Sequence, residues 1–526
     1  MPKVLIADKL SPSAVDVFRQ RGVDADYEVG LSPEELKNKL PGYEGLVVRS
    51  ATNATADILS AADGLRVIGR AGIGVDNIDV DAATQRGVVV MNTPGGNAIT
   101  TAEHAISLML AMARRIPQAN QSTKAGKWEK SRFTGVEVTN KTLGLIGCGN
   151  IGAIVADRAR GLKMRVVVYD PYLSQTRAKD LGVRKVDELD TLYGESDFIT
   201  IHVPKTESTQ GMVDAAAFAQ MKQGVRIINC ARGGLIVEED LKSAIESGHV
   251  AGAAIDVFAE EPARENPLFD LEETICTPHL GASTTEAQEK VAVQIAEQMS
   301  DYLTTGAVTN ALNMPSLTAE DSARLGPYMT LAEQLGSFAG QLTETGLKGV
   351  RLEYEGHVAS LNTRPLTHMI LASVLKPMLD QVNMVNAPVI ARERDIAVSE
   401  TAYDSPRDYH TMIRLTVETD RQTRSVAGSL FGGDKARLVE IKGIPIEAEL
   451  GPHMLYITNE DQPGLIGDLG KTLGDAGVNI ATFHLGRTDV GGDAIALIEV
   501  DGQIPEPVLR QVRSLPHIKQ AKPLRF

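Results

Sequence analysis

The chain has 526 residues, too many for one hydrophobic core, so we expect three or four domains. Its net charge of −15 argues against nucleic acid or an anionic membrane surface as a partner, and no apolar run is long enough to span a bilayer. The cysteines Cys148, Cys230 and Cys276 are odd in number and show no metal-ligand spacing, which favours a cytoplasmic protein without a structural metal.

Residues 1–97 alternate between short strands and helices, which predicts a parallel sheet covered by helices. A helix is expected to begin at Ser32, because Pro33 suits its first turn and Glu35 completes a capping box. The β-rich runs that define the alternation are 4–7, 46–49, 67–69 and 88–91.

The next segment joins this unit to the rest of the chain. A long helix is expected from Thr100, with Glu103 as its capping partner, to Arg115, and its largely apolar surface indicates a buried connection between domains. Residues 124–132 are basic and contain the only tryptophan, Trp128. They fit either a solvated loop or an arm that contacts a neighbouring subunit or an anionic substrate, and both interpretations stay open.

Residues 142–170 have the order of strand, glycine turn, helix, strand and acid that a dinucleotide-binding βαβ unit requires. Gly147 permits the tight turn, Gly149 lets the backbone approach a pyrophosphate, and Gly152 lets the helix pack against the strand. The helix N-terminus then offers free N–H groups to the phosphates. The residues expected to bind the cofactor here are Gly147, Gly149, Asn150, Ile151 and Gly152.

Asp170, at the end of the second strand of this unit, indicates which dinucleotide binds. A carboxylate there accepts hydrogen bonds from a ribose 2′-hydroxyl and repels a 2′-phosphate, so NAD is favoured over NADP. The alternative is that Asp170 only shapes a turn before Pro171.

Three polar residues follow predicted strands downstream of the glycine turn: Arg232, Glu261 and His279. Because ligands bind at the carboxyl ends of strands in an open α/β sheet, these side chains can converge. A histidine can take the hydroxyl proton as an alcohol loses hydride, and a carboxylate on its far ring nitrogen fixes the tautomer. A guanidinium can grip a substrate carboxylate through two hydrogen bonds. Each residue alone is more often structural, but together they predict a hydride-transfer site.

The rest of the chain forms a crossing helix and two further domains. Residues 287–302 predict a long helix that could return to the first unit, and 305–316 are typical of a linker. Residues 317–450 contain helices and then β-rich pieces, whereas 451–526 have the βαββαβ order of a ferredoxin-like fold. The expected fold class is α/β, with two Rossmann-like or flavodoxin-like domains, then an α+β domain and the ferredoxin-like domain. The expected domain bounds are 1–97 with 283–312, 98–282, 313–450 and 451–526.

The motifs NCARGG, DVFAEEP and PHLGAST resemble those of the D-isomer-specific 2-hydroxyacid dehydrogenases, and the similarity covers residues 1–310. This resemblance implies that Arg232, Glu261 and His279 are catalytic. It also implies that Asp256 lies near the nicotinamide, that residues 98–282 bind NAD and that the first domain binds substrate. The NAD contacts expected from these motifs are Cys230, Ala231, Arg232, Asp256, His279 and Gly281.

The segments GYEGLVVRSAT, GRAGIGVDNID, MNTPGGN and GKW, together with an intervening domain at 313–450, narrow the resemblance to long-form family members that act on 3-phosphoglycerate. The implied reaction is NAD-dependent oxidation of 3-phospho-D-glycerate to 3-phosphohydroxypyruvate, the first step of phosphorylated L-serine biosynthesis, by a homo-oligomer expected to be a tetramer. Alternatives are a broader 2-hydroxyacid dehydrogenase or 2-oxoglutarate reductase, and an NAD-sensing binding protein, which the acidic charge disfavours.

An anionic substrate requires local positive charge in this acidic chain. Arg49 and Arg70 end predicted strands that face the cleft, and with Asn97 they are the candidates for binding the phosphate and carboxylate. Ion pairs at strand ends are the alternative. Lys130 and Arg132 are weaker candidates that could reach in from a second subunit.

Residues 451–526 resemble an ACT domain, with DQPG at 461–464 and GVNI at 477–480 in its motif positions. The resemblance implies feedback inhibition by L-serine, with Asn459, Asp461 and Asn479 as candidates for the ligand site. Asn479 could instead only shape a turn.

The domain before it contains the basic residues Lys435, Arg437 and Lys442. They could form a second anion site or an ordinary solvated face.

Overall fold

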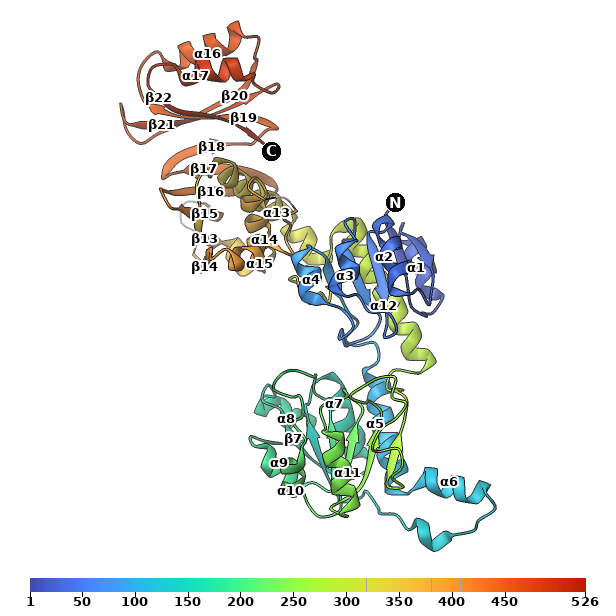
Figure 1. Cartoon of the computed structure of the whole chain (residues 1–526). Helices are drawn as coiled ribbons and strands as arrows, with labels where there is room; N and C mark the ends of the chain where they lie inside the picture. Colours follow the sequence, from blue (N-terminus) through green and yellow to red (C-terminus); the bar gives the residue numbers. More distant parts are fainter. Residues whose placement is uncertain (318, 380, 406–408) are drawn as a thin grey trace.

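The computed structural model describes residues 1–317, 319–379, 381–405 and 409–526. Four sheets follow one another along the chain and define four domains, which we number from the N-terminus. Figure 1 shows the first domain in the middle, the second below it, and the third and fourth extending from its other side. The expected fold class is confirmed. In the described part of the chain, none of the helices has the length and apolar character needed to cross a membrane.

The first domain is a parallel five-stranded sheet in the order β2-β1-β3-β4-β5. Its elements are β1 (Lys3–Ile6), α1 (Ser13–Gln20), β2 (Asp24–Tyr27), α2 (Pro33–Lys39), η1 (Leu40–Gly42), β3 (Gly45–Val48), α3 (Ala56–Ser60), β4 (Val67–Arg70), α4 (Val80–Gln85) and β5 (Val89–Met91). The capping box at Ser32 is confirmed, since its hydroxyl accepts from the Glu35 N–H and the Glu35 carboxylate accepts from the Ser32 N–H. Helix α12 (Thr285–Thr305) returns to this domain and joins its core through Val291, Ile295 and Met299, which confirms the crossing helix.

The second domain is a parallel seven-stranded sheet in the order β12-β11-β10-β9-β6-β7-β8. Its strands are β6 (Thr142–Ile146), β7 (Arg165–Tyr169), β8 (Arg184–Val186), β9 (Phe198–Ile201), β10 (Val225–Asn229), β11 (Val250–Ile255) and β12 (Thr274–Cys276), and its covering helices are α7 (Asn150–Gly161), α8 (Gln175–Leu181), α9 (Leu189–Glu195), α10 (Ala215–Gln220) and α11 (Glu238–Glu246). Strand order reverses between β6 and β9, and sheets of this kind bind ligands at the carboxyl ends of the strands beside that point.

Helix α5 (Ala98–Ala113) connects the two α/β domains and packs in the core of the second. It begins after Asn97, so the expected start at Thr100 is wrong. Thr100 lies inside the first turn, where its hydroxyl oxygen is 3.3 Å from that of Thr284. The prediction is wrong because a Thr-x-x-Glu pattern occurs inside helices as well as at their starts.

After α5, helix α6 (Ile116–Lys124) and the short helix η2 (Lys130–Phe133) extend from the second domain as an arm, residues 116–133 (Figure 1). Trp128 in this arm is 86% exposed. Such an exposed tryptophan fits the subunit-contact interpretation better than the role of an anchor within one chain.

The third domain is a mixed six-stranded sheet in the order β14-β13-β15-β16-β17-β18, in which only the β13–β14 pair is parallel among the described strands. Its elements are α13 (Ala319–Leu342), β13 (Leu347–Gly356), η3 (His357–Ser360), α14 (Arg364–Leu375), α15 (Ala387–Glu393), β14 (Ala397–Tyr403), β15 (Thr411–Thr419), β16 (Thr423–Phe431), β17 (Lys435–Ile441) and β18 (Ile444–Ala448). Helices α13 and α14 pack on one face of this sheet and form its core.

The third domain is attached to the first by asparagine side chains that bind backbone groups around the turn between α4 and β5. Nδ2 of Asn383 donates to the Gly87 carbonyl at 2.9 Å, and Nδ2 of Asn386 donates to the Gln85 carbonyl at 3.3 Å. In the connecting segment, Asn313 donates to the Val88 carbonyl at 2.8 Å and accepts from the Val90 N–H at 2.9 Å. The third domain therefore touches the turn before β5, and the far end of that strand leads to Asn97.

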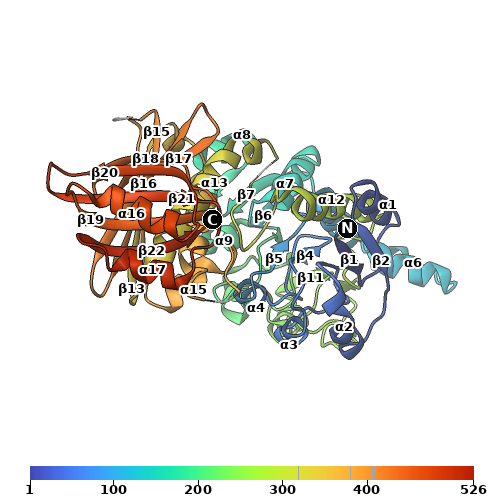
Figure 2. The ribbon, with the colours of Figure 1, turned by 90° about the horizontal axis from the view of Figure 1, so that it is seen from above.

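The fourth domain has the predicted βαββαβ order and the antiparallel strand order β20-β21-β19-β22. Its elements are β19 (His453–Glu460), α16 (Leu465–Asp475), β20 (Ile480–Arg487), β21 (Asp493–Val500), α17 (Glu506–Arg513) and β22 (Ile518–Arg525). Both helices cover one face of the sheet, as Figure 2 shows from above. The other face meets the third domain, where Tyr456 packs edge-on against Phe338 of α13 at a centroid distance of 5.7 Å.

Replacing Phe338 with alanine should loosen this junction. The side chain is fully buried, so its loss should lower the free energy of unfolding by about 3–5 kcal/mol. Urea denaturation followed by circular dichroism measures the change. Phe431→Ala, at a partly buried site in a small separate cluster, is the control; equal losses in the two variants would contradict a special role for Phe338.

Candidate active site

Two adjoining cavities lie in the cleft between the first and second domains. The basic cavity has a volume of about 730 Å³ and is lined by Arg49 and Arg70 from the first domain and by Glu261 and His279 from the second. The glycine-turn cavity has a volume of about 470 Å³ and reaches from Arg70 to the start of helix α7. Residues that line both include Arg70, Asn97, Glu261 and His279, so the two cavities form one continuous site.

The glycine turn has the backbone geometry that its sequence predicts. Gly147 has a φ of +89°, and a Cβ there would lie 2.5 Å from the carbonyl oxygen of His202. A Cβ on Gly152 would lie 2.2 Å from the Gly147 carbonyl oxygen, so only glycine lets α7 pack this close. Gly149 faces open space, with no atom within 4 Å of a built Cβ.

The N-terminus of α7 is free to bind an anion. No side chain caps it, and Gly149, Asn150 and Ile151 line the glycine-turn cavity. Unpaired N–H groups and the positive end of the helix dipole therefore face a space where a pyrophosphate fits. The residues present fit a dinucleotide cofactor.

Asp170 follows β7 and binds two backbone N–H groups. Its Oδ2 accepts from Cys148 at 2.8 Å and its Oδ1 accepts from Tyr172 at 2.8 Å. The bond to Tyr172 is the contact expected if Asp170 shapes the turn around Pro171. The bond to Cys148 connects the same carboxylate to the glycine turn. Each oxygen keeps a lone pair, so the turn role and a ribose contact are compatible.

Asp170→Asn should therefore relax the choice of cofactor. The amide keeps an acceptor oxygen but removes the negative charge that repels a 2′-phosphate, so the preference for NAD over NADP in kcat/KM should fall about tenfold or more. Steady-state kinetics with both cofactors measures the ratio. Asp180→Asn, on exposed α8, is the control, and an unchanged ratio in Asp170→Asn would contradict the assignment.

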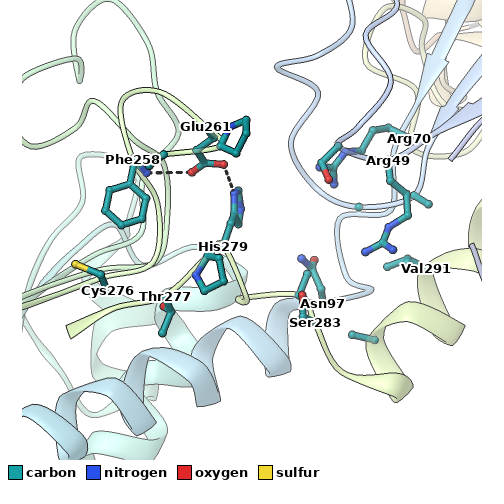
Figure 3. Close-up of a pocket in the computed structure, with 18 of the residues that line it drawn as sticks. Arg49, Arg70, Asn97, Phe258, Glu261, Cys276, Thr277, His279, Ser283 and Val291 are labelled. Atoms are coloured by element: carbon teal, nitrogen blue, oxygen red, sulfur yellow. Dashed lines mark hydrogen bonds and ion pairs between the residues drawn. The ribbon is translucent and has the colours of Figure 1, made fainter. Parts of the chain in front are cut away.

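His279 and Glu261 form a hydrogen-bonded pair on the second-domain side of the basic cavity (Figure 3). Nδ1 of His279 is 2.7 Å from Oε2 of Glu261, and Oε1 accepts from the Phe258 N–H at 3.0 Å. Burial pushes the pKa of Glu261 up, but the hydrogen bonds from His279 and Phe258 outweigh it, and the pKa is lowered overall. An ionised Glu261 holds the proton on Nδ1, which leaves Nε2 of His279 as the proton acceptor.

Arg232 lines the glycine-turn cavity with Glu261 and His279. Its Nε donates to Oδ2 of Asp76 in the first domain at 2.9 Å, and its Nη1 donates to the Ala231 carbonyl at 2.6 Å. The guanidinium lies against Gly74, where a Cβ would be 1.7 Å from Nη2. The ion pair with Asp76 joins the two domains across the cleft, and sequence analysis missed it although Asp76 lies within the GRAGIGVDNID segment.

Asp256 is fully buried beneath the cavity and is not among the residues that line it. Its Oδ1 accepts from Thr277 Oγ1 at 2.6 Å and from the Leu280 N–H at 2.7 Å, and its Oδ2 accepts from the Gly281 N–H at 2.9 Å. Burial opposes ionisation, but the hydrogen bonds, including one from His104, lower its pKa overall. The wall itself is formed in part by Cys230, Ala231 and Gly281, which line the glycine-turn cavity.

The cysteines of the site are poor nucleophiles. Burial raises the pKa of Cys148 to about 11, and burial together with Asp256 raises the pKa of Cys230. The sulfur of Cys230 lies within 4.8 Å of a ring nitrogen of His104 and of an Asp256 oxygen, but both oxygens of Asp256 already accept hydrogen bonds.

The first-domain side of the basic cavity carries two guanidinium groups, of Arg49 and Arg70, for which no ion pair is found among the described residues, although Asp8 and Asp76 lie near enough to act on Arg70. Arg70 is largely buried, its Nε has no hydrogen-bond partner, and burial together with Arg232 and Arg49 lowers its pKa to about 10. Among the described residues, the Arg49 side chain donates to the Lys9 carbonyl alone, at 3.2 Å. The buried Oδ1 of Asn97 also has no partner. Figure 3 shows Arg49 and Arg70 across the cavity from His279.

The arm residues do not reach the cavity within one chain. Arg132 is bound to Glu129 and Glu272, at 3.1 and 2.8 Å, and neither Arg132 nor Lys130 lines either cavity.

The three regulatory candidates lie in the fourth domain but have separate partners. Nδ2 of Asn459 donates to the Glu460 carbonyl at 2.8 Å, while its buried Oδ1 has no partner. Asp461 accepts from Arg487 at 2.8 Å and from the Gly491 N–H at 3.2 Å. Asn479 is exposed and donates to Asp501 at 2.7 Å.

Two of the basic candidates of the third domain have different surroundings. Arg437 stacks over Phe431 and lies 3.9 Å from Glu449. Lys442 is exposed, and partial desolvation together with the nearby Arg424 lowers its pKa.

Family models match three parts of the chain. Residues 106–281 match the D-isomer specific 2-hydroxyacid dehydrogenase NAD-binding domain, residues 324–442 the D-3-phosphoglycerate dehydrogenase intervening domain, and residues 453–517 the ACT domain. The ACT match indicates an amino-acid effector for the fourth domain.

Curated relatives match over nearly the whole chain. A D-3-phosphoglycerate dehydrogenase of Synechocystis sp. is 43% identical over 99% of this chain and 94% of its own length. That of Archaeoglobus fulgidus is 42% identical over 99% of both chains.

Solved structures match the two α/β domains. The NAD⁺-bound 3-phosphoglycerate dehydrogenase of Entamoeba histolytica is 27% identical with a TM-score of 0.51, over 59% of this chain and 98% of its own. The apo D-lactate dehydrogenase of Escherichia coli is 28% identical with a TM-score of 0.54, over 59% of this chain and 100% of its own.

Proposed function

We propose that this chain, which belongs to the D-3-phosphoglycerate dehydrogenase family, catalyses the NAD-dependent oxidation of 3-phospho-D-glycerate to 3-phosphohydroxypyruvate, the first step of phosphorylated L-serine biosynthesis. The observation that carries the proposal is the basic cavity, which has a histidine–carboxylate pair on one side and, on the other, two arginines that form no ion pair within the described part of the chain. A small hydroxy acid with two anionic groups matches both sides.

The residues of this chain divide the chemistry between them. Arg49, Arg70 and Asn97 hold the anionic groups of the substrate, and Arg232 holds the carboxylate next to the reacting carbon. Asp76 fixes Nε and the Ala231 carbonyl accepts from Nη1, so Nη2 would make this contact. Because both anionic groups of the substrate are held, the site fixes the orientation of the substrate as well as attracting it.

His279 then removes a proton. Its Nε2 accepts the proton of the C2 hydroxyl, and Glu261 stabilises the imidazolium through Nδ1. Residues 147–152 and Asp170 would hold NAD, which when bound would supply the acceptor for the hydride that leaves C2. In the reverse direction the same Nε2 returns the proton to the carbonyl oxygen.

The reaction is tested by NADH formation from 3-phospho-D-glycerate, and in reverse by NADH consumption with 3-phosphohydroxypyruvate. The competing function, a broader 2-hydroxyacid dehydrogenase or 2-oxoglutarate reductase, is measured with D-glycerate and with 2-oxoglutarate. Higher kcat/KM on the phosphorylated substrate supports the proposal, and equal or lower values overturn it. Absence of turnover on all of them, with NADH still bound, would favour a binding protein.

We also propose that L-serine is the effector of the ACT domain. The buried, unpaired Oδ1 of Asn459 is an acceptor that suits a ligand ammonium group, and Asp461 lies next but one along the chain. Asn479 has its own partner and is the weakest of the three candidates. Calorimetric titration with L-serine should show binding that Asn459→Ala weakens at least about tenfold. D-Serine is the control, and absence of heat with L-serine sinks this assignment.

We further propose that the protein is a cytoplasmic homotetramer. The arm, with Trp128 and Ile116 exposed, suits a contact between subunits of a homotetramer, and sedimentation of the wild type against Trp128→Ala tests it. Three free cysteines suit the reducing cytoplasm.

A further inference from the structure

The catalytic histidine sits in a backbone conformation that the surrounding residues must maintain. His279 has a φ of +55°, in the left-handed region that residues with a Cβ adopt at a cost. Nothing in its own side-chain contact with Glu261 fixes this angle. Asp256 restrains the backbone here. The His279 N–H donates to the Asp256 carbonyl at 2.9 Å, and the N–H groups of Leu280 and Gly281 donate to the Asp256 carboxylate.

Helix α5 supports the same loop from its other side. Thr101 Oγ1 donates to the Gly281 carbonyl at 2.9 Å. One turn along the helix, Nε2 of His104 lies 3.2 Å from Oδ1 of Asp256 and 3.4 Å from Thr277 Oγ1. Thr101 and His104 share a face of α5, so the helix contacts the loop at both ends of the Thr277–Gly281 segment.

We propose that His104 is a positioning residue for the dehydrogenase reaction: its Nε2 donates a hydrogen bond from α5 to the buried Asp256 carboxylate, which holds the loop that carries His279. The inference rests on the proposed function only for its kinetic effect. Without this donor, Asp256 keeps its loop partners but loses its tie to α5, and the loop can rotate away from the productive position of Nε2.

A metal site is the competing explanation of the same cluster. His104, Cys230 and Asp256 have potential ligand atoms within 4.8 Å of one another. However, each Asp256 oxygen already accepts from a loop donor, and burial keeps Cys230 protonated, so the chemistry favours hydrogen bonding. The metal content of the purified protein distinguishes the two explanations.

Variants of His104 in the full-length enzyme test the proposal. His104→Leu removes the donor at similar volume, and kcat should fall about tenfold while KM for 3-phosphoglycerate and NAD stays within about twofold. His104→Gln restores an N–H donor and should recover most of kcat. Ser107→Ala, at an exposed site on α5 where the hydroxyl binds only the Glu103 carbonyl, is the matched control.

Hydrogen–deuterium exchange provides a readout that needs no turnover. The amides of Leu280 and Gly281 should exchange faster in His104→Leu than in the wild type, and at nearly the wild-type rate in His104→Gln. The proposal is overturned by unchanged kcat in His104→Leu, by equal loss in the Gln and Leu variants, or by one bound zinc per chain that His104→Gln releases. If the wild type does not oxidise 3-phosphoglycerate but the exchange pattern holds, the proposed function fails and the positioning role stands.

Discussion

Replacing His279 with alanine is expected to lower kcat about 10³-fold in both directions, because it removes the group that takes and returns the hydroxyl proton. NADH should still bind, weakened at most by the loss of one expected contact, since the glycine turn and Asp170 lie on other elements and are kept. Stopped-flow and steady-state assays of both directions measure kcat, and NADH fluorescence titration measures binding.

A second variant separates proton transfer from support of the loop. Glu261→Gln keeps a hydrogen-bonding side chain against Nδ1 but removes the charge that stabilises the imidazolium, so its kcat should lie between those of the wild type and His279→Ala. His249→Gln, where the ring binds only the Met221 carbonyl, controls for losing a histidine. A His279→Ala enzyme with more than a tenth of wild-type activity would show that another group is the base.

The parts of the site that could be predicted are those encoded locally. The glycine turn follows from spacing, because a positive φ at Gly147 and close packing at Gly152 depend on neighbours a few residues away. Arg232, Glu261 and His279 could be placed on one edge because parallel strands bring their carboxyl ends together. The fold class followed from the alternation of strands and helices in the same way.

The parts that could not be predicted depend on pairs far apart in the chain. Asp76 and Arg232 are 156 residues apart, and nothing in either local sequence shows that they meet. Strand β2 (Asp24–Tyr27) also escaped prediction, since an exposed edge strand with two aspartates lacks an apolar pattern. The edge strand β14 (Ala397–Tyr403) is likewise exposed along its whole length and lacks an apolar pattern.

The asparagine contacts between the third and first domains give regulation a physical route. Asn383 and Asn386 bind the turn before β5, and the chain runs from β5 through Asn92 to Asn97, where substrate is proposed to bind. A shift of the third domain would therefore act on the substrate end of the cleft rather than on the glycine turn. An effector that works this way changes KM for substrate more than KM for NAD.

Arg70→Met is expected to lower kcat/KM for 3-phosphoglycerate about 10²-fold or more, because it removes a charged donor from a largely buried anion site. With D-glycerate, which lacks the phosphate, the change should be within about threefold if Arg70 binds that group. Steady-state kinetics on the two substrates measures the ratio. Arg86→Met, at a guanidinium paired with Asp63 and outside both cavities, is the control.

The stability of the same variant decides between a binding residue and a structural ion pair. Arg70 carries a charge into the protein interior with its Nε unpartnered, and burial already lowers its pKa to about 10. A desolvated guanidinium without a bound anion destabilises the substrate-free protein. Replacing it with methionine should therefore leave the melting temperature unchanged or raise it, while activity is lost. If Arg70 were instead a strand-end ion pair, the melting temperature would fall and both substrates would lose activity equally. Adding 3-phosphoglycerate should raise the melting temperature of the wild type but not of Arg70→Met, since binding to the native state stabilises it.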